Sequence, residues 1–148
     1  MISFPPALRE VHEELDAARK RLLNSVVSLS QEEMDFSPSA ERWLIGENLD
    51  HLRLIEDSAV RVLRKLADKA EKAGCGPDPG AGSVIHSLDR FRIENVVEKI
   101  AAPASVAPTK GILLGRLDGY QWALSVAGHE ERHRRQIENV KALRAGPS

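Results

Sequence analysis

The amino-acid sequence predicts an all-α fold that forms a single domain over residues 1–148. Three separate stretches carry apolar residues at the three- and four-residue spacing of an amphipathic helix. The chain length of 148 residues lies in the usual range for one domain and is sufficient for a core of its own. A content of 42% hydrophobic and 29% charged residues is typical of a soluble globular protein.

The first predicted helix covers residues 6–29, and Pro5 and Pro6 suit a helix start. His12 lies one residue away from the apolar stripe, so we expect a histidine at the surface or edge. After this helix, residues 30–33 have the Ser-Gln-Glu-Glu pattern of a capping box and predict one short turn before Pro38. The apolar stripe consists of Leu8, Val11, Leu15, Ala18, Leu22 and Val26.

The second predicted helix covers residues 45–73 and ends at a Gly/Pro-rich loop, residues 74–82. His51 lies at the edge of its core stripe, from which an imidazole can reach a neighbouring helix. Cys75 in the loop is the only cysteine, which excludes an intrachain disulfide and indicates a loop thiol rather than a nucleophile. The stripe consists of Leu49, Leu52, Ala59, Leu63, Leu66 and Ala70, flanked beside His51 by Leu44, Asn48, Ile55 and Val62.

Residues 83–101 allow two interpretations. Apolar residues at helical offsets favour a short helix, whereas the frequent β-branched residues favour an extended strap over the bundle. We expect His86 in this region to lie on the surface.

The last predicted helix covers residues 118–143, and it carries His129 and His133 one turn apart on the same face. This face continues with Trp122, Val126, Ile137 and Val140, so we expect the two histidines to face the core. The other sides carry Glu130 and Glu131 four residues before Arg134 and Arg135, which is the spacing of ion pairs on a solvated surface.

Three imidazoles from two helices would give a divalent transition metal three protein ligands and leave a fourth position for water or substrate. Two buried imidazoles side by side each need a partner, and a shared ion satisfies both at once. The pair on the last helix also fits ordinary core histidines with hydrogen bonds, so the pair alone leaves both interpretations open.

His129-Glu130-Glu131-Arg132-His133 also matches the metalloprotease pattern H-E-x-x-H, in which the glutamate is the general base. Such proteases take a third ligand from further along the chain, where Glu138 is the only acidic residue. Glu138 is rotated roughly 140° from His133 on the helix and cannot join the site. We therefore expect Glu130 to form a surface pair or to contact a ligand, and Asn48 and Asp50 are further candidates for such a contact.

The pattern W-x-I-G-E-x-x-x-H at residues 43–51, followed by G-Y-Q-W and H-E-x-R-H-x-x-Q-I at residues 119–137, resembles the DinB/YfiT-like superfamily of metal-dependent enzymes. The likeness extends to residues 87–94 and to the stretch before Pro103. It implies an up-down four-helix bundle whose zinc or nickel ion is bound by His51, His129 and His133. Members include thiol-dependent transferases or isomerases and proteins described only as hydrolases.

Two departures from that pattern matter. Leu44 occupies a position where relatives often have a Ser or Thr cap, so the helix start needs another cap. The third bundle helix, expected after residues 108–111, is absent from the sequence. We therefore predict three long helices with a long, partly helical connection, and a homodimer in which a second copy fills the open groove. The metal site would then lie near the interface.

We expect a divalent-metal-dependent enzyme, a hydrolase or a thiol-dependent transferase, acting on a small-molecule substrate. The alternative is a non-catalytic metal-binding or dimeric helical interaction module. A net charge of -1 gives no reason to expect nucleic acid or a membrane as partner. The N-terminus has no signal-peptide pattern and no apolar run is long enough to span a bilayer, so we expect a cytoplasmic protein.

Overall fold

The computed structural model describes residues 5–75, 82–89 and 118–146. These residues form helices α1 (Pro6–Val26), α2 (Gln31–Met34), α3 (Ile45–Lys72) and α4 (Gly119–Ala145), and no strand. The prediction of an all-α fold with three long helices is confirmed for this part of the chain. The predicted absence of a further helix concerns residues 90–117, which lie outside the described residues, as do residues 90–101 of the predicted strap or short helix.

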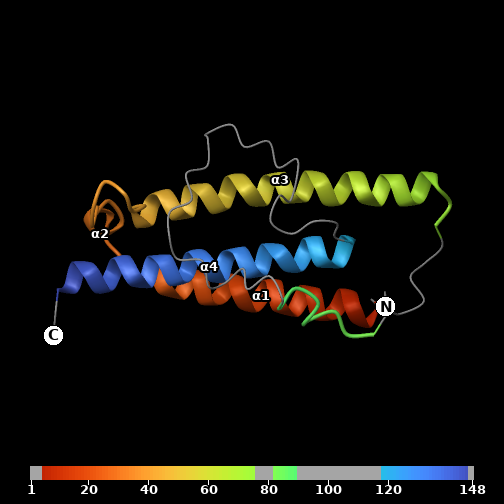
Figure 1. Ribbon diagram of the computed structural model, residues 1–148, viewed down its shortest axis with the longest axis horizontal. Helices are drawn as coiled ribbons and strands as arrows, with labels where there is room; N and C mark the ends of the chain where they lie inside the picture. The colour runs from red at the N-terminus through yellow and green to blue at the C-terminus, as the bar shows by residue number, and fades with distance from the viewer. Residues whose placement is uncertain (1–4, 76–81, 90–117, 147–148) are drawn as a thin grey trace.

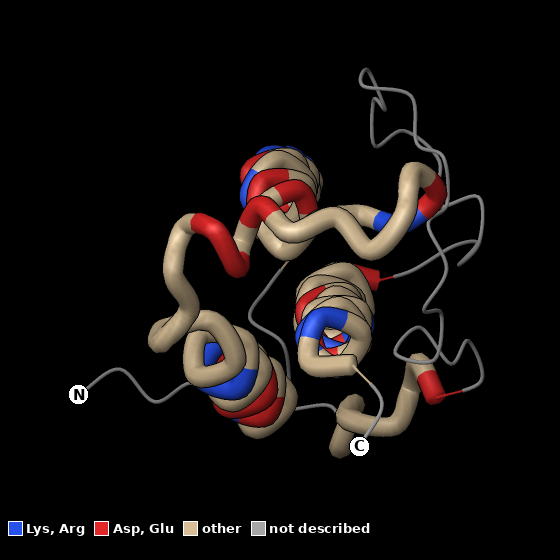
Figure 2. The backbone as a smooth tube through the Cα atoms, turned by 90° about the vertical axis from the view of Figure 1, so that its left-hand side faces the viewer, with Lys and Arg blue, Asp and Glu red and all other residues tan. Residues whose placement is uncertain are grey.

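The three long helices form an up-down arrangement around α4. In Figure 1, α1 and α4 run in the same direction, and α3 runs in the opposite direction. Seen along the helices in Figure 2, they lie at the corners of a triangle. α4 packs against both α1 and α3, so two of its faces are buried.

Local hydrogen bonds explain where the helices begin and end. The predicted capping box is confirmed, because Ser30 Oγ accepts the Glu33 N–H at 3.2 Å and Glu33 accepts the Ser30 N–H at 2.8 Å. Ser30 is extended, as this cap requires, and α1 ends at Val26, three residues before the predicted end at residue 29. The start of α3 is capped from within the helix, since the Glu47 carboxylate accepts the Leu44 N–H at 3.0 Å.

α4 has a capping box that the sequence patterns above did not identify. Asp118 accepts the Gln121 N–H at 2.8 Å, and the Gln121 side chain accepts the Asp118 N–H at 3.1 Å. The signal was present in the sequence as Asp followed three residues later by Gln.

Two apolar clusters hold the helices together. One consists of Leu22, Ile45, Leu52, Ile137 and Val140, and the other of Val11, Leu88, Ala123 and Leu124. Leu88 comes from residues 82–89, which form turns rather than a helix and pack against α1 and α4. The predicted stripes are too long at their ends, because Leu8 and Leu66 are each 37% exposed.

Candidate metal site

The antiparallel pairing of α3 and α4 brings the three predicted histidines together. One nitrogen of each of His51, His129 and His133 lies within 4.8 Å of those of the other two. His133 is only 1% exposed, whereas His51 and His129 are partly exposed. The site therefore has a buried side, formed by His133, and a more open side towards the other two rings.

Asn48 fixes which nitrogen of His133 faces the other histidines. The Asn48 amide nitrogen donates to the Leu44 carbonyl at 2.8 Å, so its amide oxygen is the atom that lies 2.7 Å from His133 Nδ1. An amide oxygen only accepts, hence Nδ1 carries the proton and donates it. The lone pair of neutral His133 is then on Nε2, which lies 3.1 Å from His129 Nε2.

The site keeps its imidazoles uncharged. Burial, followed by the positive fields of neighbouring groups, lowers the pKa of His129 to about 3 and the pKa of His133 to about 2. Burial and Arg132 also lower the pKa of His51, against a smaller opposing effect of Asp50. All three rings are thus neutral near pH 7, which is the form that binds a metal.

The geometry of the histidines fits a metal ion. Two nitrogens that each lie about 2.0–2.1 Å from one tetrahedral ion are about 3.3–3.4 Å apart, close to the 3.1 Å between the Nε2 atoms of His129 and His133. A shift of about 1.4 Å or less brings nitrogens at the 4.8 Å limit of the cluster to that separation. Without an ion, His129 must donate from Nε2 to the lone pair on His133 Nε2. The buried Nδ1 atom of His129 has no hydrogen-bond partner among the residues that the structure describes.

Trp43, just before α3, forms an aromatic wall beside the histidines. Its ring stacks on His133, with centroids 5.6 Å apart and planes at 23°, and meets His51 edge-on at 4.6 Å. In the sequence, Trp43 is recognisable only as part of a pattern, and no role for it could be predicted from that pattern. The available signal was its position eight residues before His51, at the first residue of that pattern.

Glu130 lies on a different side of α4 from the histidines. It is 1% exposed, and its carboxylate accepts hydrogen bonds from Arg19 of α1 at 2.9 and 2.6 Å. Arg19 also pairs with Glu56 of α3, so this cluster joins all three long helices. The prediction of a surface pair with Arg134 is therefore wrong, because α1 covers this face of α4. Glu130, held by Arg19, is also not placed as the general base of a metalloprotease.

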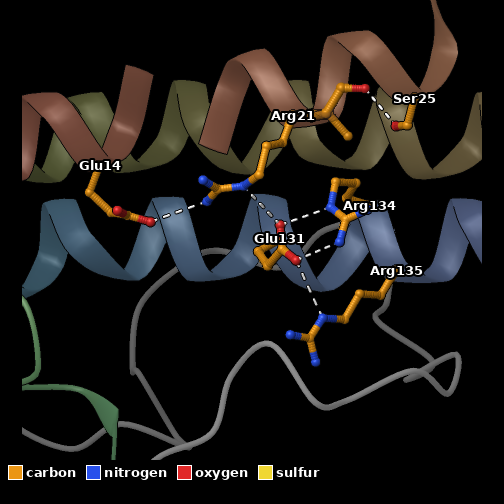
Figure 3. Close-up of polar contacts among 7 residues, drawn as sticks. Glu14, Arg21, Ser25, Glu131, Arg134 and Arg135 are labelled. Carbon is orange, nitrogen blue, oxygen red and sulfur yellow. Dashed lines mark hydrogen bonds and ion pairs between the residues drawn. The ribbon is translucent and has the colours of Figure 1, made fainter. Parts of the chain in front are cut away.

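Glu131 forms the neighbouring contact between α1 and α4 (Figure 3). The predicted pair with Arg135 is present at 3.4 Å, and Glu131 also binds Arg134 at 2.7 Å and Arg21 of α1 at 3.4 Å. These charges therefore connect two helices in addition to facing solvent.

The remaining predicted residues lie apart from the cluster. Asp50 is on the surface and binds Arg53 at 3.1 Å, so Asn48 is the candidate that contacts a histidine. His12 and His86 are exposed, as predicted, and His86 lies 2.9 Å from the Asp89 carboxylate. Cys75 is exposed at the end of the described residues that follow α3.

Comparison with known proteins identifies the family of this chain. A family model described as the DinB superfamily matches residues 14–137, and the chain belongs to this superfamily. The uncharacterized protein YuaE of Bacillus subtilis (strain 168) is 25% identical over 150 residues, which cover 84% of this chain and 93% of that protein. No solved structure matches the chain significantly. Among the described residues, no helix is both long and apolar enough to cross a bilayer.

Proposed function

We propose that this protein is a divalent-metal-dependent enzyme of the DinB type, either a hydrolase or a thiol-dependent transferase, with His51, His129 and His133 as the metal ligands. The observation that carries the proposal is the cluster of three neutral imidazoles, two of whose Nε2 atoms face each other at 3.1 Å. Zinc or nickel suits three imidazole ligands.

Asn48 and Trp43 have separate roles beside the proposed metal ligands. His133 presents Nε2 because Asn48 holds its Nδ1 proton, and such a contact sets both the tautomer and the ring orientation of a metal ligand. Trp43 covers the imidazoles on one side and keeps water from that side. A bound divalent ion would lower the pKa of a water or thiol at its open position and polarise a substrate.

Metal analysis of protein purified without chelator tests the proposal. We expect close to one ion per chain in the wild type and none held tightly by His129→Ala or His133→Ala. His12→Ala and His86→Ala are matched controls, since both remove an exposed histidine away from the cluster. An unchanged metal content in both α4 variants would show that the ion binds elsewhere.

Activity is then measured with the metal-loaded protein. Simple esters test for a hydrolase, and a low-molecular-weight thiol with an electrophilic acceptor tests for a transferase. Turnover that disappears in His133→Ala but persists in His12→Ala supports an enzyme. Stoichiometric metal without turnover of either kind would favour the alternative, a non-catalytic metal-binding module.

A further inference from the structure

A groove lies between α1 and α3, and α4 forms its floor. Both helices pack against α4, and in the end-on view of Figure 2 they lie apart from each other. The groove has a volume of about 360 Å³, which is within the usual range for sites of small molecules. Its apolar walls come from all three long helices and consist of Leu15, Ala59, Val60, Leu63, Ala123 and Val126.

One end of this groove carries two carboxylates and a single guanidinium. Arg19 binds Glu56 of α3 and Glu130 of α4, and all three side chains line the groove. Asp16 also lines it, but its charge is paired with Lys20 at 2.7 Å. Because one positive charge faces two negative charges, this end of the groove has an excess of negative charge when both carboxylates are ionised.

Glu130 has an oxygen atom that the described residues leave without a hydrogen bond. Both hydrogen bonds from Arg19 go to Oε1, at 2.9 and 2.6 Å, whereas Oε2 is buried and has no partner. The side chain of Glu130 is only 2% exposed, so bulk water does not solvate it freely. An unsatisfied buried acceptor costs free energy, and a donor on a ligand in the groove would remove that cost.

We propose that this groove binds a small organic cation, an amine or amidine that is joined to an apolar body. The N–H groups of the cation would donate to Glu56 and to Oε2 of Glu130, and the apolar body would pack against the walls. Hydrogen bonds from a cation to a carboxylate are stronger than those between neutral groups. The groove is separate from the histidine cluster, because Glu130 lies on a different side of α4, and ligand binding there requires no metal ion.

Benzamidine and benzamide test this inference, because the two probes have nearly the same shape and only benzamidine is charged. Their binding to the full chain is measured by NMR titration at constant ionic strength and about pH 8. Burial raises the pKa of Glu130 to about 7, so both carboxylates are ionised under these conditions. We expect benzamidine to bind at least about tenfold more tightly than benzamide, which corresponds to about 1.4 kcal/mol.

Two variants separate the charge of the groove from its shape. Glu56→Gln removes one negative charge and should weaken the binding of benzamidine about tenfold. Ala59→Leu removes no charge but fills part of the groove, and it should also weaken benzamidine. Glu71→Gln is the matched control, since Glu71 is exposed on the same helix and about 22 Å from Glu56 along its axis. This separation exceeds the Debye length of about 8 Å at physiological salt, so the affinity for benzamidine should be unchanged.

Three results would overturn the inference: no binding of benzamidine at millimolar concentration, equal affinities for the two probes, or a change of less than about twofold in Glu56→Gln. Should Glu56→Gln not fold, Ala59→Leu and the comparison of the two probes in the wild type decide. Removal of bound metal with a chelator should leave the affinity for benzamidine unchanged. The groove and the metal site can therefore fail independently of each other.

Discussion

Replacing Asn48 by leucine tests the link between folding and metal binding at this site. Asn48 is fully buried, and its amide oxygen is the acceptor for the His133 Nδ1 proton at 2.7 Å. Leucine has the same number of side-chain heavy atoms and the same branching but no acceptor, so a buried N–H loses its partner at a cost of about 1–3 kcal/mol. For a chain of this size, a loss of about 2 kcal/mol lowers Tm by roughly 4–8 °C.

The same substitution should weaken metal binding. Without Asn48 the His133 ring can adopt either tautomer, and loss of such a supporting contact typically lowers metal affinity about 10- to 100-fold. The measurements are chemical denaturation of metal-free protein and competitive metal titration against a chelator. Asn48→Asp keeps an acceptor and should bind metal within about tenfold of the wild type.

Ser58→Ala is the control for stability alone. Ser58 is a buried polar residue of α3 whose hydroxyl donates to the Leu54 carbonyl at 3.0 Å. This variant should lose some stability and keep its metal affinity. If Asn48→Leu binds metal as tightly as the wild type, the argument that Asn48 orients His133 is refuted.

Three further expectations concern acidity, the inter-helix ion pair and assembly. Because the pKa values of His129 and His133 are lowered in the folded protein, the unfolded chain binds more protons than the folded one below pH 6.5. The free energy of unfolding of the metal-free protein should therefore fall by up to about 1.4 kcal/mol per histidine for each pH unit between pH 6.5 and 3. The raised pKa of Glu130, about 7, has the opposite effect on stability as the pH falls. This effect of Glu130 largely cancels when the wild type is compared with a variant in which both His129 and His133 are replaced by Gln. Equal slopes of unfolding free energy against pH in these two proteins would contradict this account. Arg19→Met should lower the free energy of unfolding by about 2 kcal/mol, measured by chemical denaturation. This is less than the loss of a fully buried pair costs, because Arg19 is half exposed and Glu130 can take up a proton. Lys20→Met, which removes the exposed pair with Asp16, should lower it by less than about 1 kcal/mol. Homodimerisation stays a prediction that sedimentation at micromolar concentration decides, with a stable monomer as the contrary result.

The helices and the histidine cluster could be predicted because both depend on periodicity within single helices. Apolar spacing located α1, α3 and α4 with errors of a few residues at their ends. His129 and His133 share a face whatever packs against it, and an edge position allowed His51 to reach them. The sequence alone could not show that Asn48 reaches His133. This contact depends on how far α3 and α4 are shifted along their axes relative to each other, and these helices are distant in the sequence.

The place of Glu130 could not be predicted for a related reason. A carboxylate four residues before an arginine is the pattern of a solvated helix face. The same carboxylate can equally bind an arginine of another helix, and here Arg19 of α1 binds it. The pattern on one helix does not distinguish these cases, because the choice depends on which face its neighbours cover. α4 has two covered faces, because it packs against both α1 and α3, whereas its sequence predicts only one.

Polar contacts on both covered faces fix the rotation of α4, and this rotation places the histidines. Apolar packing is non-directional and tolerates small rotations of a helix about its axis, so it does not by itself set the position of a nitrogen within a few tenths of an ångström. The Arg19–Glu130 pair holds α4 against α1, and the Asn48–His133 hydrogen bond holds it against α3. Because Glu130 directly follows His129, a rotation that moved one would move the other. Arg19 should therefore influence metal affinity as well as stability, although it lies on the other side of α4 from the ion.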